Sequence, residues 1–227
     1  MAESGETLTY LQLEQGSARL ARYLASRGLR HGDHIALLTD NQPKAFEVYW
    51  AALRSGLYIT AVNSHLSRDE ISYILTDSGA RALIAAAHLG DVVADLGAST
   101  PDIEIRLSSG GRVDGFLSYE DEVAEVSPRP LEIQPRGADM LYSSGTTGRP
   151  KGIKPDLPNR EVHEPGDTYV ELFGPAYDFG PETVYLSPAP IYHAAPLRFG
   201  GVVHALGGTV VMMERFDAAR ALSVIER

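Results

Sequence analysis

Short runs of apolar residues recur along the 227-residue chain, and longer stretches of mixed apolar and polar residues separate them. Ile35-Ala36-Leu37-Leu38 and Ala82-Leu83-Ile84-Ala85 are two such runs. A continuous apolar run, as opposed to an alternating one, is typical of a strand that is buried on both faces. We predict strands over residues 35–38, 57–62, 82–85, 139–142, 183–186 and 209–213.

The stretches between these runs have the spacing and end signals of helices. Over residues 10–27 the apolar side chains fall mostly on one helical face, Thr9 is placed to cap the helix, and Gly28 is placed to end it. Ser67 and Glu70 form a capping-box pattern before another helix. We predict helices over residues 10–27, 41–54, 71–76, 88–96, 119–126, 197–206 and 217–227.

The alternation of strands with helices of ~10–18 residues predicts a layered α/β fold with largely parallel sheets. We expect residues 1–107 to form one α/β subdomain portion, residues 108–137 a connector with one short helix, and residues 138–227 a second α/β portion. Five prolines interrupt residues 154–182, so that stretch is expected to be irregular around at most one helix.

Composition and charge exclude several functional classes. The chain has 30 acidic and 20 basic residues, a formal charge of −10, which disfavours general binding to nucleic acid or to an anionic membrane. It has no cysteine, which excludes disulfides and thiolate chemistry. No secretory signal opens the chain, and no run approaches the ~18 apolar residues of a membrane span, so we expect a cytoplasmic protein.

Residues 143–152 combine hydroxyl side chains, three glycines and a lysine in the order Ser-Ser-Gly-Thr-Thr-Gly-Arg-Pro-Lys-Gly. Glycines let backbone N–H groups converge on a ligand, and hydroxyls and a lysine add donors and charge, a set that suits a polyphosphate. Pro150 and Gly152 flank the lysine, so the loop is expected to join two strands instead of opening a helix. By composition alone, an ordinary surface turn fits equally well.

The order of residues in this loop, preceded by Tyr142, closely resembles the phosphate-binding signature of the adenylate-forming superfamily, with Ser143 where threonine is usual. That superfamily includes acyl-CoA synthetases, luciferases and peptide-synthetase adenylation domains. Other stretches share the resemblance, among them residues 8–33, Asn41 with residues 51–56, and residues 187–193. His193 makes the chain most similar to acyl-CoA synthetases.

The resemblance implies that a carboxylate attacks the α-phosphate of ATP to give an acyl-adenylate and pyrophosphate, and that coenzyme A then displaces AMP. Lys151, assisted by Mg²⁺, would offset charge on the pyrophosphate. Tyr192 and His193 would line the pocket of a fatty or other bulky apolar acid. Arg149 is a weaker candidate for phosphate. Ser143, Ser144, Thr146 and Thr147 would orient the β- and γ-phosphates, and Gly145 and Gly148 would shape the loop.

Other residues carry simpler interpretations. His204 is expected to pack in an apolar helix, and His31 and His34 to be a loop pair that binds no metal. The acidic clusters at residues 69–70 and 120–122 are expected to be solvated helix ends.

Two alternative functions stay open at this point. One is a non-catalytic fragment that binds a nucleotide or a partner, and the other is a domain that adenylates amino acids or aryl acids. The family pattern continues with an adenine-contacting Thr-Glu motif, a ribose-binding aspartate and a C-terminal lid domain bearing a catalytic lysine. Because none of these occurs in the chain, we expect an N-terminal portion that is inactive alone. The oligomeric state is left open.

Overall fold

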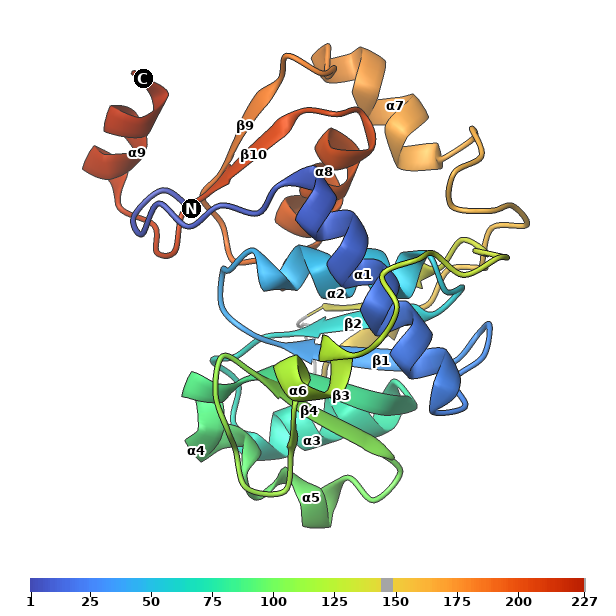
Figure 1. Cartoon of the computed structure of the whole chain (residues 1–227). Coiled ribbons are helices and arrows are strands. Elements are labelled where there is room, and N and C mark those ends of the chain that lie inside the picture. Colours follow the sequence, from blue (N-terminus) through green and yellow to red (C-terminus); the bar gives the residue numbers. More distant parts are fainter. Residues whose placement is uncertain (144–148, 227) are drawn as a thin grey trace. The chain divides into compact units, whose positions relative to one another are not determined.

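The computed structural model describes residues 1–143 and 149–226 (Figure 1). The chain forms two compact units that interleave along the sequence. The larger unit comprises Thr9–Thr39 and Glu47–His163, and the smaller comprises Met1–Leu8, Asp40–Phe46 and Glu164–Arg227. The consecutive subdomain boundaries expected from the sequence stay a prediction. Within the described ranges, no helix is both long and apolar enough to cross a membrane.

The larger unit is built on a six-stranded sheet in the order β5-β4-β3-β1-β2-β6, and every adjacent pair is parallel. All residues of the central strand β1 and of its neighbour β2 are buried, as the continuous apolar runs predict. The layered α/β fold with a largely parallel sheet is therefore confirmed. The strands are β1 (His34–Leu38), β2 (Tyr58–Val62), β3 (Ala80–Ala86), β4 (Ile105–Ser109), β5 (Leu117–Ser118) and β6 (Ala138–Asp139).

Local signals place the helix starts correctly. α1 (Tyr10–Ser26) begins after a capping box of Thr9 and Gln12, and α3 (Arg68–Asp77) begins after one of Ser67 and Glu70. α2 (Lys44–Leu53) and α6 (Tyr119–Ala124) also lie where the sequence predicts them. Figure 1 shows α3, α4 and α5 on one side of the six-stranded sheet and α1 on the other.

Three sequence predictions in this unit are wrong in detail. The helix expected over residues 88–96 is a 3₁₀ turn η1 (Ala87–Leu89) followed by α4 (Gly90–Val93) and α5 (Leu96–Ser99). Glycine has a low helix propensity, and Gly90 and Gly97 begin or interrupt these turns. Strands β4 and β5 were not predicted, and His34 lies in β1, buried and stacked on Tyr58, instead of in a loop.

Arginines of α1 hold the end of the connector that the sequence predicts over residues 108–137. Arg19 Nη1 donates to the carbonyl of Ala124 at 2.8 Å, and Arg22 Nη2 donates to that of Pro130 at 2.8 Å. A proline-rich stretch has few backbone donors, so its free carbonyls suit such side-chain donors. The connector is thus tied to α1.

The smaller unit contains a two-stranded parallel sheet of β9 (Val184–Ser187) and β10 (Thr209–Met212). Its helices are α7 (Thr168–Tyr177), α8 (Ala194–Ala205) and α9 (Ala218–Ile225). α7 is the single helix expected in residues 154–182. α8 begins three residues before its predicted start, because Pro196 lies in the first turn, where a missing N–H costs no helical hydrogen bond.

Candidate functional site

The loop singled out by the sequence is carried on a β-hairpin. β7 (Leu141–Ser143) pairs antiparallel with β8 (Lys151–Ile153), which confirms that the loop joins two strands. Ser143 is the register partner of Lys151, and Tyr142 is that of Gly152. Five loop residues lie outside the described residues: Ser144, Gly145, Thr146, Thr147 and Gly148. The sequence predicts that the three hydroxyl residues contact phosphate and that the two glycines shape the loop.

The hairpin brings together the two predicted phosphate-contacting residues that are described. Directly opposed residues of antiparallel strands have Cβ atoms about 4.5–5.5 Å apart, so the Ser143 hydroxyl and the Lys151 ammonium group can reach one anion. Both residues are exposed. Within the part of the chain that the structure describes, no hydrogen bond or ion pair engages the Lys151 ammonium group. It is therefore available to a ligand.

The stem of the hairpin depends on close packing between Tyr142 and Gly152. A Cβ atom at Gly152 would lie 2.8 Å from Tyr142 Cζ and 2.5 Å from Met140 Cε, so a larger residue there would force these side chains to shift. Tyr142 donates its hydroxyl hydrogen to Asp77 Oδ2 at 2.6 Å. Burial raises the pKa of Tyr142, and the bond to the Asp77 carboxylate raises it further, so the hydroxyl stays a donor.

Two other basic residues of the hairpin region have aromatic partners. The Arg149 guanidinium lies 5.0 Å from the centroid of the Tyr73 ring, and Lys154 Nζ lies 4.6 Å from that of Tyr58. The Tyr58 hydroxyl in turn donates to the carbonyl of Pro155 at 2.7 Å. Lys154 thus lies against an aromatic ring, away from the Lys151 ammonium group that the candidate site uses.

His34 stacks on the same Tyr58 ring, with the ring centroids 4.5 Å apart. Burial lowers the pKa of His34 to about 4, and the positive charge of Lys154 acts in the same direction. The histidine is therefore neutral at physiological pH and belongs to the packing of β1 and β2. Among the described residues, no group of three or more His, Cys, Asp or Glu could hold a metal ion.

In the smaller unit, Asn41 holds the 187–193 motif in place. Its Nδ2 donates to the carbonyls of Ala189 (3.1 Å) and Met213 (2.8 Å), and its Oδ1 accepts the N–H of Ile191 at 2.7 Å. One amide side chain thereby satisfies three backbone groups around a turn whose prolines, Pro188 and Pro190, offer no N–H. The family resemblance included Asn41, but only the structure shows what it bonds.

Tyr192 and His193, the predicted acid-pocket residues, lie at the start of α8. Their ring centroids are 4.6 Å apart, and His193 is the N-cap residue but makes no side-chain capping bond. The imidazole is exposed. Burial and the negative charge of Asp40 raise the pKa of Tyr192. Ser143 and Lys151 belong to the larger unit, and Tyr192 and His193 belong to the smaller one.

His204 packs against aromatic and small residues, as the sequence predicts. Its ring meets Phe46 edge to face, with centroids 4.6 Å apart, and burial lowers its pKa to about 4. Gly200, one turn earlier on α8, leaves room for the same Phe46 ring, because a Cβ there would lie 2.2 Å from Phe46 Cζ. These residues are structural.

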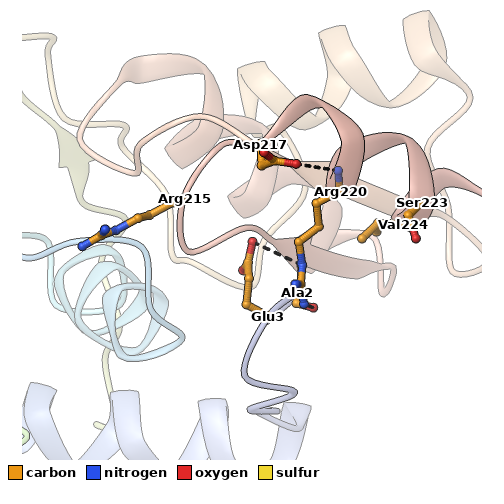
Figure 2. A pocket seen from close by; sticks show the side chains of 7 residues that line it. All are labelled: Ala2, Glu3, Arg215, Asp217, Arg220, Ser223 and Val224. Atoms are coloured by element: carbon orange, nitrogen blue, oxygen red, sulfur yellow. Dashed lines mark hydrogen bonds and ion pairs between the residues drawn. The ribbon is translucent and has the colours of Figure 1, made fainter.

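A cavity of about 560 Å³ lies in the smaller unit (Figure 2). Arg220 contacts three of the other lining residues. Its Nη2 donates to the Ala2 carbonyl at 3.1 Å, and its Nε lies 3.8 Å from Glu3 Oε1. Its backbone N–H donates to Asp217 Oδ1. None of the predicted site residues lines this cavity. Its lining residues are Ala2, Glu3, Arg215, Asp217, Arg220, Ser223 and Val224.

The curated proteins that resemble this chain include a ligase and a synthase. It is 31% identical over 222 residues to a fatty acid–[acyl-carrier-protein] ligase, ScoC, of Streptomyces coeruleorubidus, covering 97% of this chain and 41% of the relative. It is 32% identical over 228 residues to a feruloyl-CoA synthase of an Amycolatopsis species, covering 98% and 42%. The chain thus spans about two fifths of the length of these curated relatives.

Solved structures also resemble the chain in fold. The ATP-bound structure of MatB from Rhodopseudomonas palustris is 26% identical and superimposes with a TM-score of 0.75, covering 99% of this chain and 44% of that one. The family model described as "AMP-binding enzyme" matches residues 1–227, the entire chain. The resemblance to this family is thereby confirmed, and the chain belongs to the AMP-binding enzyme family.

Proposed function

We propose that the chain is the phosphate-binding portion of an AMP-forming acyl-CoA synthetase. The observation that carries this proposal is the β7–β8 hairpin, which places Ser143 opposite Lys151 at the two ends of a glycine- and hydroxyl-rich loop. A hydroxyl donor and an unengaged ammonium group, both exposed, suit the β- and γ-phosphates of ATP. The solved relative MatB holds ATP, which supports the same ligand here.

In the proposed reaction a carboxylate oxygen of the acid attacks the α-phosphorus of ATP, and the bond to pyrophosphate breaks. The thiol of coenzyme A then attacks the acyl carbon, and AMP leaves as the thioester forms. Lys151 offsets the negative charge that gathers on the departing pyrophosphate. Mg²⁺ usually binds through substrate phosphates and few protein ligands, so we propose that it enters with ATP.

For the hydroxyls of the loop, we keep the roles implied by the resemblance. Ser143, Ser144, Thr146 and Thr147 orient the β- and γ-phosphates, and Gly145 and Gly148 let the backbone approach them. For the acid, Tyr192 and His193 are the proposed lining residues. The exposed His193 imidazole, which makes no capping bond, is consistent with that role.

We propose a fatty or other bulky apolar acid as substrate. The relative named for a fatty acid supports this proposal. The feruloyl-CoA synthase supports an aryl acid as the alternative substrate. The acceptor also differs between these names, since the first relative is a ligase for an acyl carrier protein. The acid is tested by exchange between ATP and pyrophosphate, and the acceptor is tested by thioester formation with coenzyme A or an acyl carrier protein.

The test is acid-dependent exchange between ATP and pyrophosphate in a chimera that carries this chain in place of the aligned segment of the feruloyl-CoA synthase. We expect exchange with medium- or long-chain fatty acids and a loss of about 100-fold in Lys151→Ala. Lys154→Ala, which removes a cation that lies over Tyr58, is the matched control and should keep most of the activity. Exchange that Lys151→Ala leaves intact would refute the role of the loop.

The 227-residue chain alone is expected to form no thioester, because it spans only about two fifths of its curated relatives. Incubation with ATP, Mg²⁺, coenzyme A and a panel of acids, followed by mass spectrometry for acyl-CoA, checks this expectation. Thioester formation by the chain alone would show that it supplies more than the phosphate-binding portion.

A further inference from the structure

Helix α3 ends in an acidic residue, Asp77, at a position where a negative charge is unfavourable. The C-terminus of a helix carries partial negative charge, so a carboxylate there is destabilising unless other groups stabilise it. Asp77 has two such groups: Oδ2 accepts the Tyr142 hydroxyl at 2.6 Å, and Oδ1 accepts the Tyr73 hydroxyl at 3.4 Å.

Tyr142 connects this carboxylate to the incoming end of the phosphate loop. It directly precedes Ser143, and Gly152 leaves room for its ring on the facing strand. The rings of Tyr142 and Tyr73 both pack against the hydrophobic core around α3 and β3. Tyr142 is therefore held by three contacts: its hydroxyl bonds to Asp77, and its ring lies beside Gly152 and packs against the hydrophobic core. These contacts fix the backbone position from which Ser143 extends.

Tyr73 connects the same carboxylate to the outgoing end of the loop. The Arg149 guanidinium lies 5.0 Å from the centroid of the Tyr73 ring, and Arg149 precedes Lys151 by two residues. One residue of α3 thus contacts Arg149 and another contacts Tyr142, and the Tyr73–Asp77 hydrogen bond joins these two. We call these four residues, Tyr73, Asp77, Tyr142 and Arg149, the α3 clamp.

We propose that the α3 clamp is a positioning device for the phosphate loop, with Asp77 as its central residue. This inference rests on the proposed function. Ordering groups when a ligand binds costs conformational entropy, and holding Ser143 and Arg149 in place in advance reduces that cost. Tyr73 and Asp77 act through Tyr142 and Arg149, and no contact between either of them and the nucleotide is proposed.

The first arm of the test measures the affinity of the 227-residue chain for MgATP by calorimetry. Asp77→Asn and Tyr142→Phe should each weaken binding about threefold to tenfold. Tyr142→Phe removes the donor of the bond to Asp77 Oδ2, and Asp77→Asn replaces its charged acceptor with a neutral amide. Because both substitutions act on the same bond, the double variant should bind no more weakly than the weaker single variant. Asp114→Asn and Tyr177→Phe, exposed residues outside the clamp, are the matched controls and should bind as the unmodified chain does.

The second arm measures amide hydrogen exchange without nucleotide. Loss of the clamp should speed exchange at Tyr142 and Gly152, the paired residues of the stem, while β1 and β2 keep their protection. If the clamp only stabilised the fold, the variants would have a lower melting temperature than the unmodified chain. Their affinity for MgATP, measured well below that temperature, would equal that of the unmodified chain. Unchanged affinity in both single variants, with the unmodified chain binding MgATP, overturns the positioning role.

The two arms separate this inference from the proposed function. If the unmodified chain binds no MgATP, the proposed function fails, and so does the claim that the clamp sets nucleotide affinity. Faster stem exchange in the variants would then show that the clamp only holds the hairpin. If the chain binds MgATP and Lys151→Ala abolishes binding, but Asp77→Asn has no effect in either arm, the function stands and the clamp does not.

Discussion

The two units contain parallel sheets of similar sequence pattern but very different burial. In the larger unit, β1 has β2 and β3 as neighbours, and all five of its residues are buried. In the smaller unit, β9 and β10 pair with each other (Figure 1). Val184 at the start of β9 is 70% exposed. β1 and β9 both coincide with short apolar runs, so such a run predicts a strand but not how deeply the strand is buried.

The helices show the same contrast. α3 buries Ile71, Ile74 and Leu75, whereas α9 buries none of its residues and leaves Leu222 64% exposed. A helix in an α/β layer is stabilised mainly by the apolar face that it packs on a sheet. We therefore expect the stability of this chain to come chiefly from the larger unit, and the experiments below test that expectation from the largest effect to the smallest.

Leu83 in the middle of β3 should show the largest effect. It is completely buried in the core cluster, so Leu83→Ala should destabilise the larger unit by about 2–5 kcal/mol. Trp50 is the sole tryptophan and lies in the larger unit, so its fluorescence during urea unfolding reports the change. Leu222→Ala in α9 is the matched control and should cost less than about 0.5 kcal/mol.

Equal losses from these two leucine substitutions would contradict the contrast between the units. A change in the urea dependence of unfolding, as opposed to its midpoint, would indicate that the substitution altered the unfolded state or the cooperativity instead.

Asn41 should show an intermediate effect, confined to the smaller unit. Asn41→Ala removes three hydrogen bonds to backbone groups, each with a net contribution of about 1 kcal/mol. Hydrogen exchange should become faster over residues 184–197, most clearly at Ile191, while β1 stays protected. Asn159→Ala, at an exposed position, is the control. Faster exchange in β1 as well would show that the units do not open separately.

Two buried histidines, one in each unit, should give the smallest effect. Burial lowers the pKa of both His34 and His204 to about 4, below the ordinary value of 6.5. Between pH 6.5 and pH 4 the unfolded chain binds more protons than the folded one, so stability falls as the pH is lowered through this range. Each histidine should contribute on the order of 1 kcal/mol.

His34→Gln and His204→Gln test this prediction by urea unfolding at pH 7 and pH 5. Each substitution should reduce the difference between the two pH values, His34→Gln in the larger unit and His204→Gln in the smaller. An undiminished difference would show that other groups carry the pH dependence.

The sequence predicted well those features that depend on neighbouring residues. The helix cap at Thr9, the capping box at Ser67 and the two strands joined by the loop around Pro150 are set within a few residues, and each was found. The contacts of Asp77 were missed because its partner Tyr142 lies 65 residues away. The burial of His34 was missed for the same reason, since the ring that it stacks on comes from the next strand.

The division of the candidate site follows the same physics. Residues 143–152 could be singled out because their chemistry is contiguous in the sequence, whereas the three bonds of Asn41 join segments about 150 and 172 residues apart. Three residues that the sequence offers as phosphate ligands are described: Ser143, Arg149 and Lys151. Ser143 and Lys151 are paired at the end of the β7–β8 hairpin.

The central claim is that this loop binds the phosphates of ATP, and calorimetric titration of MgATP into the 227-residue chain tests it most directly. The account predicts saturable binding that Lys151→Ala weakens at least tenfold and Lys154→Ala leaves within twofold. Absence of binding by the unmodified chain, or binding that is equally strong after Lys151→Ala, would contradict it.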